Sequence, residues 1–311
     1  MPASFAADLC GYRKKNGNPN TSDNNDDQSK YLGKSLFEAV GVPDGQEVGD
    51  DPGKNLEAAV AADLAPRRPD LDLELSRAVT DFDQYRHLGV FGNFRKGYAP
   101  SSSDIEEFIR LADNLPTSPA TTRLRNVLQQ SRSRFEGRDY LVSQMLDNMP
   151  EESLLRVDVT VGQHRSEARP PLMHLGLSAK WSLRTDRAQD CISQGSKLAT
   201  QRRGAMPHFA VITMEPRPSM LKILADGSGA IDCVYHLHLP ALIEAVEVQR
   251  KKRTSAHGRP WSPGVTFDRL IRQRRLRDYD ELVTAMDAIP TDGAPSATAQ
   301  VVRCSEAGVN H

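Results

Sequence analysis

The residues best suited to chemistry lie in residues 178–187, which hold one lysine, two arginines and one aspartate. The apolar residues before them predict a strand, and the charged residues after them predict a helix. Lys180, at the predicted strand end, can stabilise charge on a phosphate under attack. Arg184 and Arg187 can each donate two parallel hydrogen bonds to a guanine edge, and Asp186 can accept from a cytosine amino group. The segment therefore predicts cleavage of DNA at a sequence that contains G and C.

A suitable acid precedes this lysine. Residues 154–162 read as a strand of β-branched residues that contains Asp158 and ends at a glycine. If the two strands are adjacent, the Asp158 carboxylate and the Lys180 ammonium reach one edge of a sheet. A carboxylate there can hold Mg²⁺, which polarises a phosphate and lowers the pKa of an attacking water. The spacing alone is weak, because an aspartate in a strand beside a lysine more often forms an exposed pair.

The wider sequence resembles the family of type II restriction endonucleases typified by NgoMIV, the branch of PD-(D/E)xK nucleases that reads sites centred on CCGG. The resemblance extends over about residues 53–246 and is most specific over 178–236. The segments that carry it are residues 178–189, 202–208, 211–219 and 227–236, with 53–57 and 82–88 upstream. The resemblance implies an α/β (α+β) fold with a mixed, restriction-endonuclease-like β-sheet flanked by helices and a helical N-terminal half.

The resemblance also implies roles for individual residues. Lys180 matches the catalytic lysine, and Ser178 matches the serine two positions before it. Asp158 is the candidate metal-binding aspartate, with the backbone carbonyl of Ala179 as a second ligand, and Glu57 matches an accessory glutamate on an early helix. The residues that match the readers of the CCGG core are Arg184, Asp186 and Arg187.

The chain departs from the family pattern near the aspartate. Val157 precedes Asp158 where the family has proline, and the connection from Asp158 to Ser178 is shorter than the family's. Asp147 is the alternative metal-binding residue, but its surroundings predict a helix rather than a strand.

A second departure concerns the acid that this branch carries fourteen residues after the lysine, where this chain has Gln194. An amide oxygen is a poorer ligand and base than a carboxylate. The expected consequences are slow cutting, a higher Mg²⁺ requirement, use of Glu57 or Asp190 instead, or loss of cleavage.

These observations predict a Mg²⁺-dependent type II restriction endonuclease that cleaves both DNA strands at a palindrome with a CCGG core. GCCGGC is the candidate full site, cut to staggered 5′-overhang ends. A palindrome implies a homodimer, the resemblance adds a homotetramer, and a cognate DNA methyltransferase is expected in the same cell. The alternative is a sequence-specific DNA-binding protein with a degenerate, non-cleaving site. A small-molecule hydrolase lacks support, since no triad, glycine-rich phosphate loop or metal-ligand cluster is present.

Charge and cysteine usage fit this interpretation. The 311 residues carry a net charge of −1, so any attraction to DNA must come from local clusters. Residues 250–277 contain ten lysines and arginines and a single acid, Asp268. The four cysteines have no CxxC spacing, which argues against zinc and for a reduced cytoplasmic location. The family resemblance implies that this cytoplasm is bacterial. No apolar run is long enough to span a membrane.

The predicted organisation is a flexible polar tail (1–30), a single domain (31–288) and a loose tail (289–311). Within the domain we expect a helical part (31–150), a catalytic sheet core (151–248) and a basic segment (249–288). The predicted strands are 156–161, 174–181, 208–214 and 230–236. The predicted helices are 54–64, 73–88, one beginning near 102, 121–130, 140–148, 186–202, 218–225 and 240–248.

Overall fold

The computed structural model describes residues 2–47, 52–148, 155–166, 168–226, 229–258 and 260–291. The chain divides into two compact units, Met1–Arg86 with Leu155–His311 and His87–Leu154. The sequence predicts one domain over residues 31–288, and the structure differs because residues 87–154 contact one another more than they contact the rest. The predicted tail from 292 onward lies outside the described residues. No helix in the described parts of the chain is long and apolar enough to cross a membrane.

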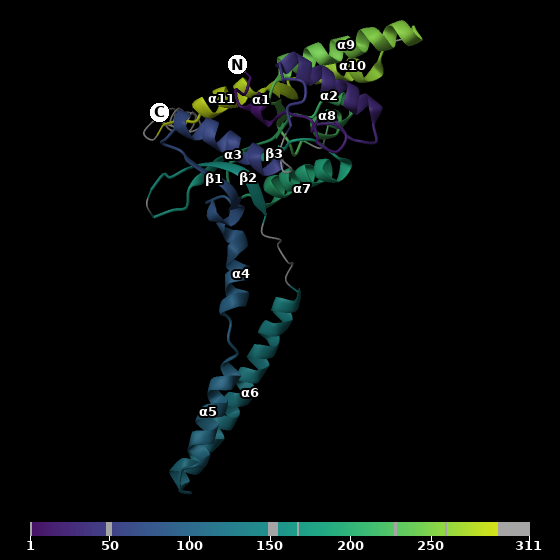
Figure 1. The fold of residues 1–311 in the computed structure, drawn as a ribbon. Helices are drawn as coiled ribbons and strands as arrows, with labels where there is room; N and C mark the ends of the chain where they lie inside the picture. Colours follow the sequence, from purple (N-terminus) through teal and green to yellow (C-terminus); the bar gives the residue numbers. More distant parts are fainter. Residues whose placement is uncertain are drawn as a thin grey trace, which may run out of the picture. The chain divides into compact units, whose positions relative to one another are not determined.

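The first unit is built on a mixed sheet (Figure 1). Its six described strands lie in sequence order. β2 is antiparallel to both of its neighbours, β1 and β3, whereas β3, β4, β5 and β6 run parallel. The strands are β1 (Asp72–Ala78), β2 (Arg156–Gln163), β3 (Leu172–Lys180), β4 (His208–Thr213), β5 (Cys233–His236) and β6 (Leu276–Asp278). The prediction of a mixed sheet flanked by helices is confirmed.

Helices surround and connect these strands. The parallel strands are joined by α7 (Thr185–Gln201), α8 (Pro218–Ala225), and α9 (Leu239–His257) with α10 (Ser262–Arg272), as parallel pairing requires a crossover. The remaining elements of this unit are α1 (Ala6–Leu9), α2 (Asp27–Val40), α3 (Pro52–Leu64), η1 (Ala65–Arg67), η2 (Val79–Asp81) and α11 (Tyr279–Asp287).

Apolar runs in the central strands explain where the core lies. Val157, Val159 and Val161 alternate along β2 and are fully buried. Residues 209–212 of β4 form an unbroken buried run, which is typical of a parallel strand covered on both faces. Periodicity therefore predicts β2, β3, β4, α7 and α8 close to their observed bounds.

The predicted helix over residues 73–88 is wrong. This segment forms β1, η2 and the first residues of α4 (Arg86–Gly97). Its residues at helical spacing do enter the core, since Val79, Phe82 and Tyr85 are buried. However, β1 pairs with β2 through residues 72–78, and this long-range pairing outweighs the local preference.

Residues 2–30 also differ from the predicted flexible tail. They contain α1 and the start of α2, which Asp26 caps by accepting from the Gln28 and Ser29 N–H groups. Asn20 and Thr21 are buried. The run of Asn, Asp, Gly and Pro builds turns here instead of disorder, because these side chains hydrogen-bond to nearby backbone.

The second unit contains most of α4, together with α5 (Ser101–Asp113) and α6 (Pro119–Asn148). The two helices predicted at 121–130 and 140–148 are one continuous helix, α6. Its polar middle contains good helix formers and an i,i+4 ion pair between Arg132 Nε and Glu136 Oε1 at 2.8 Å. Arg125 bonds to the Ala112 carbonyl and Ser102 N–H bonds to Asp139, so α5 and α6 form an antiparallel hairpin.

An ion pair at the amino ends of β4 and β5 makes the stability of the first unit depend on pH. His208 Nδ1 lies 3.0 Å from Asp232 Oδ2. Burial lowers the pKa of His208, but hydrogen bonds and charge from Asp232 and Cys233 outweigh burial and raise this pKa to about 9. The folded-state pKa exceeds that of an unfolded histidine, so the stabilisation is complete below about pH 6.5 and is lost as pH rises through about 9.

We therefore expect wild type to lose more stability than the His208→Asn variant between pH 6 and pH 9.5, measured by urea unfolding. The expected difference is on the order of 1 kcal/mol, because Asp232 is 45% exposed and solvent screens the pair. Equal losses in the two proteins would show that this pair contributes nothing.

Candidate functional site

The sheet brings Asp158 and Lys180 into direct contact. Asp158 Oδ2 accepts from Lys180 Nζ at 2.5 Å, from the Ala179 N–H at 2.8 Å and from Ser178 Oγ at 3.1 Å. Both charged side chains are about four-fifths buried, at 18% and 21% exposure. The structure thus gathers four residues that the sequence assigns to one site.

The strand register explains this meeting. Val159 of β2 pairs with Leu177 of β3, which makes Asp158 and Ser178 neighbours across the antiparallel pair. Ser178 and Lys180 are two residues apart and so share one face of the sheet. Lys180 is also the last residue of β3, so its side chain reaches the edge where the parallel strands end.

Helix α7 covers this face. Cys191 Sγ lies 3.5 Å from Ser178 Oγ, and burial raises the pKa of the Cys191 thiol. Gln194, one turn further along, shares this side of α7. Its Oε1 atom is buried and has no hydrogen-bond partner among the described residues. An unpaired buried oxygen is a position that a cation or water can satisfy.

The oxygen atoms at this site fit a hard divalent cation. Asp158 Oδ1 accepts no hydrogen bond from any residue that the structure describes, whereas Oδ2 has three donors. The Ala179 carbonyl and Gln194 Oε1 would supply two further oxygens. No group of three His, Cys, Asp or Glu side chains suited to a metal occurs within the described ranges. Any cation here is therefore held by one carboxylate and neutral oxygens.

The predicted base-reading residues follow directly. Arg184 precedes α7 as its N-cap, Asp186 lies in the first turn, and Arg187 follows; all three are exposed. Arg187 Nη1 makes one long hydrogen bond, 3.4 Å, to the Ser182 carbonyl. The guanidinium groups are thus available to a ligand outside the protein.

A buried ion pair anchors the loop that carries these residues. Glu215 is fully buried and its Oε1 lies 2.6 Å from Arg217 Nε. The two side chains hydrogen-bond to both backbone groups of Leu183. Glu215 Oε2 accepts from the Leu183 N–H (2.7 Å), and Arg217 Nη2 donates to the Leu183 carbonyl (2.6 Å). Burial raises the pKa of Glu215, while Arg217 acts in the opposite direction and favours the carboxylate. Glu215 therefore anchors this loop from beyond the end of β4.

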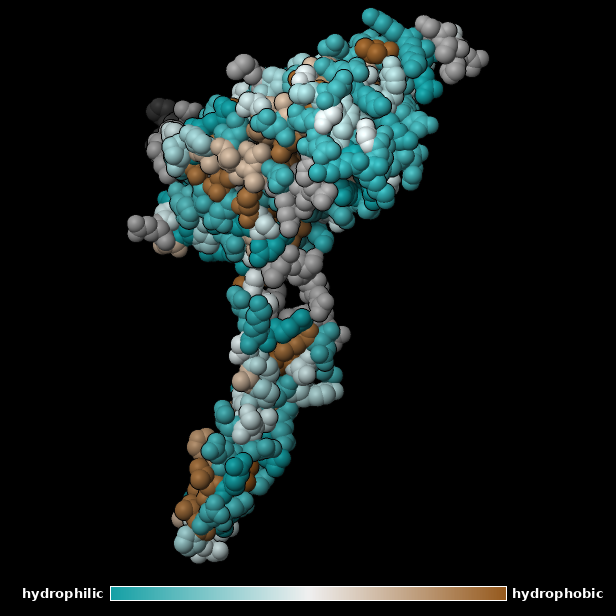
Figure 2. All heavy atoms as spheres, in the orientation of Figure 1, coloured by the Kyte–Doolittle hydropathy of each residue, from teal (hydrophilic) through white to brown (hydrophobic). Residues whose placement is uncertain are grey.

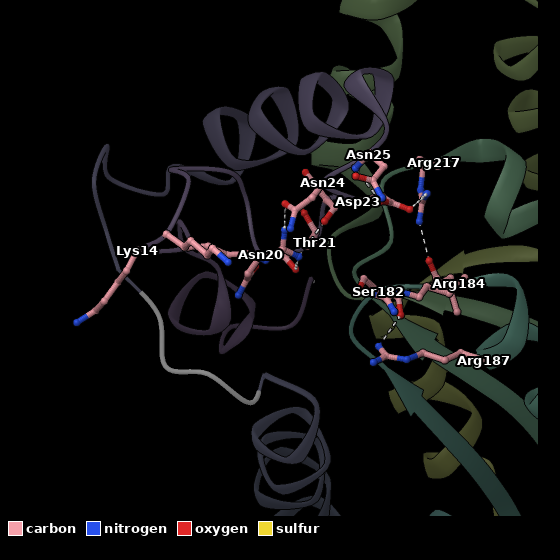
Figure 3. Close-up of a pocket in the computed structure, with 14 residues that line it drawn as sticks. Lys14, Asn20, Thr21, Asp23, Asn24, Asn25, Ser182, Arg184, Arg187 and Arg217 are labelled. Atoms are coloured by element: carbon pink, nitrogen blue, oxygen red, sulfur yellow. Dashed lines mark hydrogen bonds and ion pairs between the residues drawn. The ribbon is translucent and has the colours of Figure 1, made fainter.

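The N-terminal segment forms the other wall of a cavity of about 570 Å³ beside this loop. Figure 3 shows Asn20, Thr21, Asp23 and Asn24 facing Ser182, Arg184 and Arg187 across it. The cationic residues that line this cavity are Arg13, Lys14, Lys15, Arg184, Arg187 and Arg217.

Buried hydrogen bonds hold the segment in place. Trp181 Nε1 donates to Asn20 Oδ1 at 3.0 Å, and Arg13 Nη2 donates to the Asn20 and Ser22 carbonyls. Trp181 is buried and connects this segment to the end of β3. The sequence-based prediction misses Arg13, Lys14 and Lys15. Three consecutive cationic residues before a run of turn formers were the available signal.

The anchor predicts a large stability difference between two arginines of the same cavity. Arg217→Ala would leave the Glu215 carboxylate buried without its partner, which costs about 3–5 kcal/mol. Arg187→Ala, at an exposed position, should change stability by less than about 0.5 kcal/mol. Urea unfolding of both variants measures this difference, and equal stabilities would contradict the anchoring role.

The three other candidate acids lie on three different helices. Glu57 is half-buried on α3, a helix that packs against β2 and β3. Asp190 is exposed on α7. Asp147 is exposed on α6, in the second unit, and not in a strand.

Comparison with known proteins gives a family match. Residues 76–287, more than half of the chain, match the model of the NgoMIV restriction enzyme family. The type II restriction enzyme NgoMIV of Neisseria gonorrhoeae is 46% identical over 77 residues, which are 25% of this chain and 27% of that enzyme. The chain thus aligns with about a quarter of that relative's length.

Proposed function

Because this chain belongs to the NgoMIV restriction enzyme family, we propose that it is a type II restriction endonuclease, a phosphodiester hydrolase that cleaves both strands of DNA at a specific site. The observation that carries the proposal is the contact of Asp158 with Lys180 beside the exposed Arg184 and Arg187. Adjacent elements thus supply an ammonium group that can face a phosphate and two guanidinium groups that can face the bases.

The proposed catalytic roles follow from the geometry. A Mg²⁺ ion held by Asp158 and the Ala179 carbonyl, when bound, would polarise the phosphate and lower the pKa of a water. Lys180 orients the attacking water and offsets negative charge that develops on the phosphate. Ser178 donates to Asp158 and so fixes the carboxylate. Glu57 has the accessory role that the family pattern implies.

The proposed recognition site has a CCGG core, with GCCGGC as the candidate full sequence and staggered 5′-overhang ends. Arg184 and Arg187 read the two guanines of a half-site, and Asp186 reads a cytosine. Arg13, Lys14 and Lys15 line the same cavity and suit phosphate contacts that fix the register.

Two partners besides DNA follow from this chemistry. A palindromic site requires a two-fold protein assembly, so a homodimer or a homotetramer binds it. A nuclease of this specificity would cut its own genome unless a cognate methyltransferase modified the same sites.

The direct test is incubation of the purified protein with plasmid DNA that bears GCCGGC sites, with and without Mg²⁺, followed by sequencing of the ends. A plasmid without CCGG is the control. Discrete Mg²⁺-dependent fragments with ends inside CCGG would support the proposal. Cutting of both plasmids alike would contradict the specificity.

Gln194 favours one alternative, a sequence-specific DNA-binding protein without useful cleavage. Intact plasmid together with CCGG-selective retention in a gel shift would support this alternative. Absence of both cutting and selective retention would contradict both functions.

The substitution Gln194→Glu discriminates between these functions. Its carboxylate would add a charged ligand, so we expect at least about tenfold faster cutting or a lower Mg²⁺ requirement. Gln201→Glu, the same change at the end of the same helix, is the control and should leave the rate unchanged. An unaltered rate and Mg²⁺ dependence in Gln194→Glu would contradict the proposed metal arrangement.

A further inference from the structure

The α5–α6 hairpin has almost no core of its own. Of residues 87–148 whose side chains the structure describes, only Ala112 is buried. Two helices that bury so little apolar surface gain little free energy from folding together. The hairpin therefore needs a further surface to cover it.

Exposed apolar side chains mark where that surface lies. Seven of them, six on α5 and α6 and one in the connection that follows α5, are between 42% and 60% exposed. Figure 2 shows several brown residues gathered toward one end of the hairpin. The seven are Phe108, Leu111, Leu115, Leu124, Val127, Leu141 and Met145.

The helical spacing places these residues on one side of the hairpin. The half-buried positions that join the helices include Ile109 on α5 and Leu128 on α6. The exposed stripes lie one position earlier, at Phe108 and Val127. A step of one residue back along a helix rotates the position by about 100° around the helix axis. Because the two helices are antiparallel, this rotation brings both stripes to the same side of the hairpin. The stripe on α6 keeps alternating spacings of three and four through Leu141, which is the repeat of a helix–helix seam.

The charged residues in the middle of this face indicate which kind of protein surface can bind to it. Counting along the same stripes, Asp104 falls on α5, and Arg134 and Arg138 fall on α6. Asp104 and Arg134 have no ion-pair partner among the described residues. When two copies meet about a two-fold axis that runs along the hairpin between the two faces, α5 of one copy packs against α6 of the other. Apolar ends then meet apolar ends, and Asp104 of one copy approaches Arg134 of the other, because the two residues lie at the same level of the hairpin. A face that complements itself in this way fits a second copy of the chain.

We propose that this face, hereafter the hairpin face, joins two copies of the chain by packing two hairpins into an antiparallel four-helix bundle. Seven half-exposed large side chains, at about 100 Å² each, would bury about 700 Å² per copy. The total of about 1,400 Å² lies within the range of stable, specific interfaces. The proposal concerns assembly without DNA and does not depend on cleavage.

Sedimentation velocity of the full chain without DNA, from about 1 to 50 µM, tests the proposal. We expect a dimer or larger assembly for wild type, and at least tenfold weaker association for Leu124→Glu/Val127→Glu. The control is Asn126→Glu/Gln129→Glu, which adds the same two charges to the same helix at exposed positions off the hairpin face. Circular dichroism checks that both variants remain helical.

Monomeric wild type would overturn the proposal, as would equal effects of the two double variants. A charge exchange provides an independent measurement. Arg134→Asp alone should weaken association, and Asp104→Arg/Arg134→Asp should restore it, because each exchanged residue meets its complement on the second copy. Failure of the exchange to restore association, after a loss in the single variant, would overturn the two-fold arrangement. A nuclease assay that shows no cleavage would leave these outcomes unchanged, so the two proposals fail separately.

Discussion

Replacement of Lys180 by alanine should reduce cleavage at least about 10³-fold while specific binding of CCGG-containing DNA stays within about threefold of wild type. Lys180 Nζ is the single side-chain cation in contact with Asp158 among the described residues. Loss of one preorganised group that stabilises transition-state charge costs about 10²–10³ in rate. The variant also leaves the Asp158 charge without its cation, which adds to the loss.

Binding should survive because Lys180 is separate from the residues proposed to read the bases. Its side chain is largely buried against Asp158, whereas Arg184 and Arg187 are exposed beyond the strand end. Single-turnover cleavage and a gel shift in Ca²⁺ measure the two properties independently. Lys222→Ala, at an exposed position on α8, is the control and should cut normally. Cutting within tenfold of wild type, or parallel loss of binding, would contradict the role of Lys180.

Local pattern in the sequence predicts the central strands, whereas the pairing of Asp158 with Lys180 rests also on the family resemblance, because the spacing of these two residues is a weak signal. Alternating valines mark β2, an apolar run marks β4, and Lys180 lies where one strand pattern ends. Adjacent strands then need only antiparallel pairing to bring the carboxylate and the ammonium together. These features use short-range periodicity, which a single sequence records well.

The missed features depend on contacts between distant segments. β1 forms because the edge of β2 offers backbone hydrogen bonds to residues 72–78, although Val79 and Phe82 follow helical spacing. The N-terminal segment is ordered by Trp181 and by its position beside residues 182–184, more than 150 residues away. No local preference of Asn, Asp or Gly encodes such a partner.

The second unit illustrates the same limit at larger scale. Its helices are predictable, but their exposed apolar stripes are understandable only after the pairing of α5 with α6 is known. Leu111 and Val127 are large apolar residues on these helices, and in the structure they are exposed. Residues at core spacing that remain exposed in a monomer are what an interface requires.

Replacement of Arg187 by alanine should abolish specific DNA binding without harming the fold. A bidentate arginine–guanine contact provides about 1–3 kcal/mol of discrimination. A two-fold assembly on a palindrome loses two such contacts, about 2–6 kcal/mol, which corresponds to an affinity loss of about 30-fold to 10⁴-fold. The exposed guanidinium makes one long bond to Ser182 within the described residues, so its removal disturbs little else.

Equilibrium titrations of a GCCGGC duplex and of a scrambled duplex separate base readout from phosphate contact. For Arg187→Ala we expect the two affinities to converge, since phosphate contacts do not depend on sequence. Arg165→Ala, an exposed arginine between β2 and β3, is the matched control and should keep the difference. If Arg187→Ala keeps its preference for GCCGGC, the base readout must reside in other residues. The N-terminal wall of the same cavity, with Arg13, would then be the next segment to test, because it presents a guanidinium to the same space.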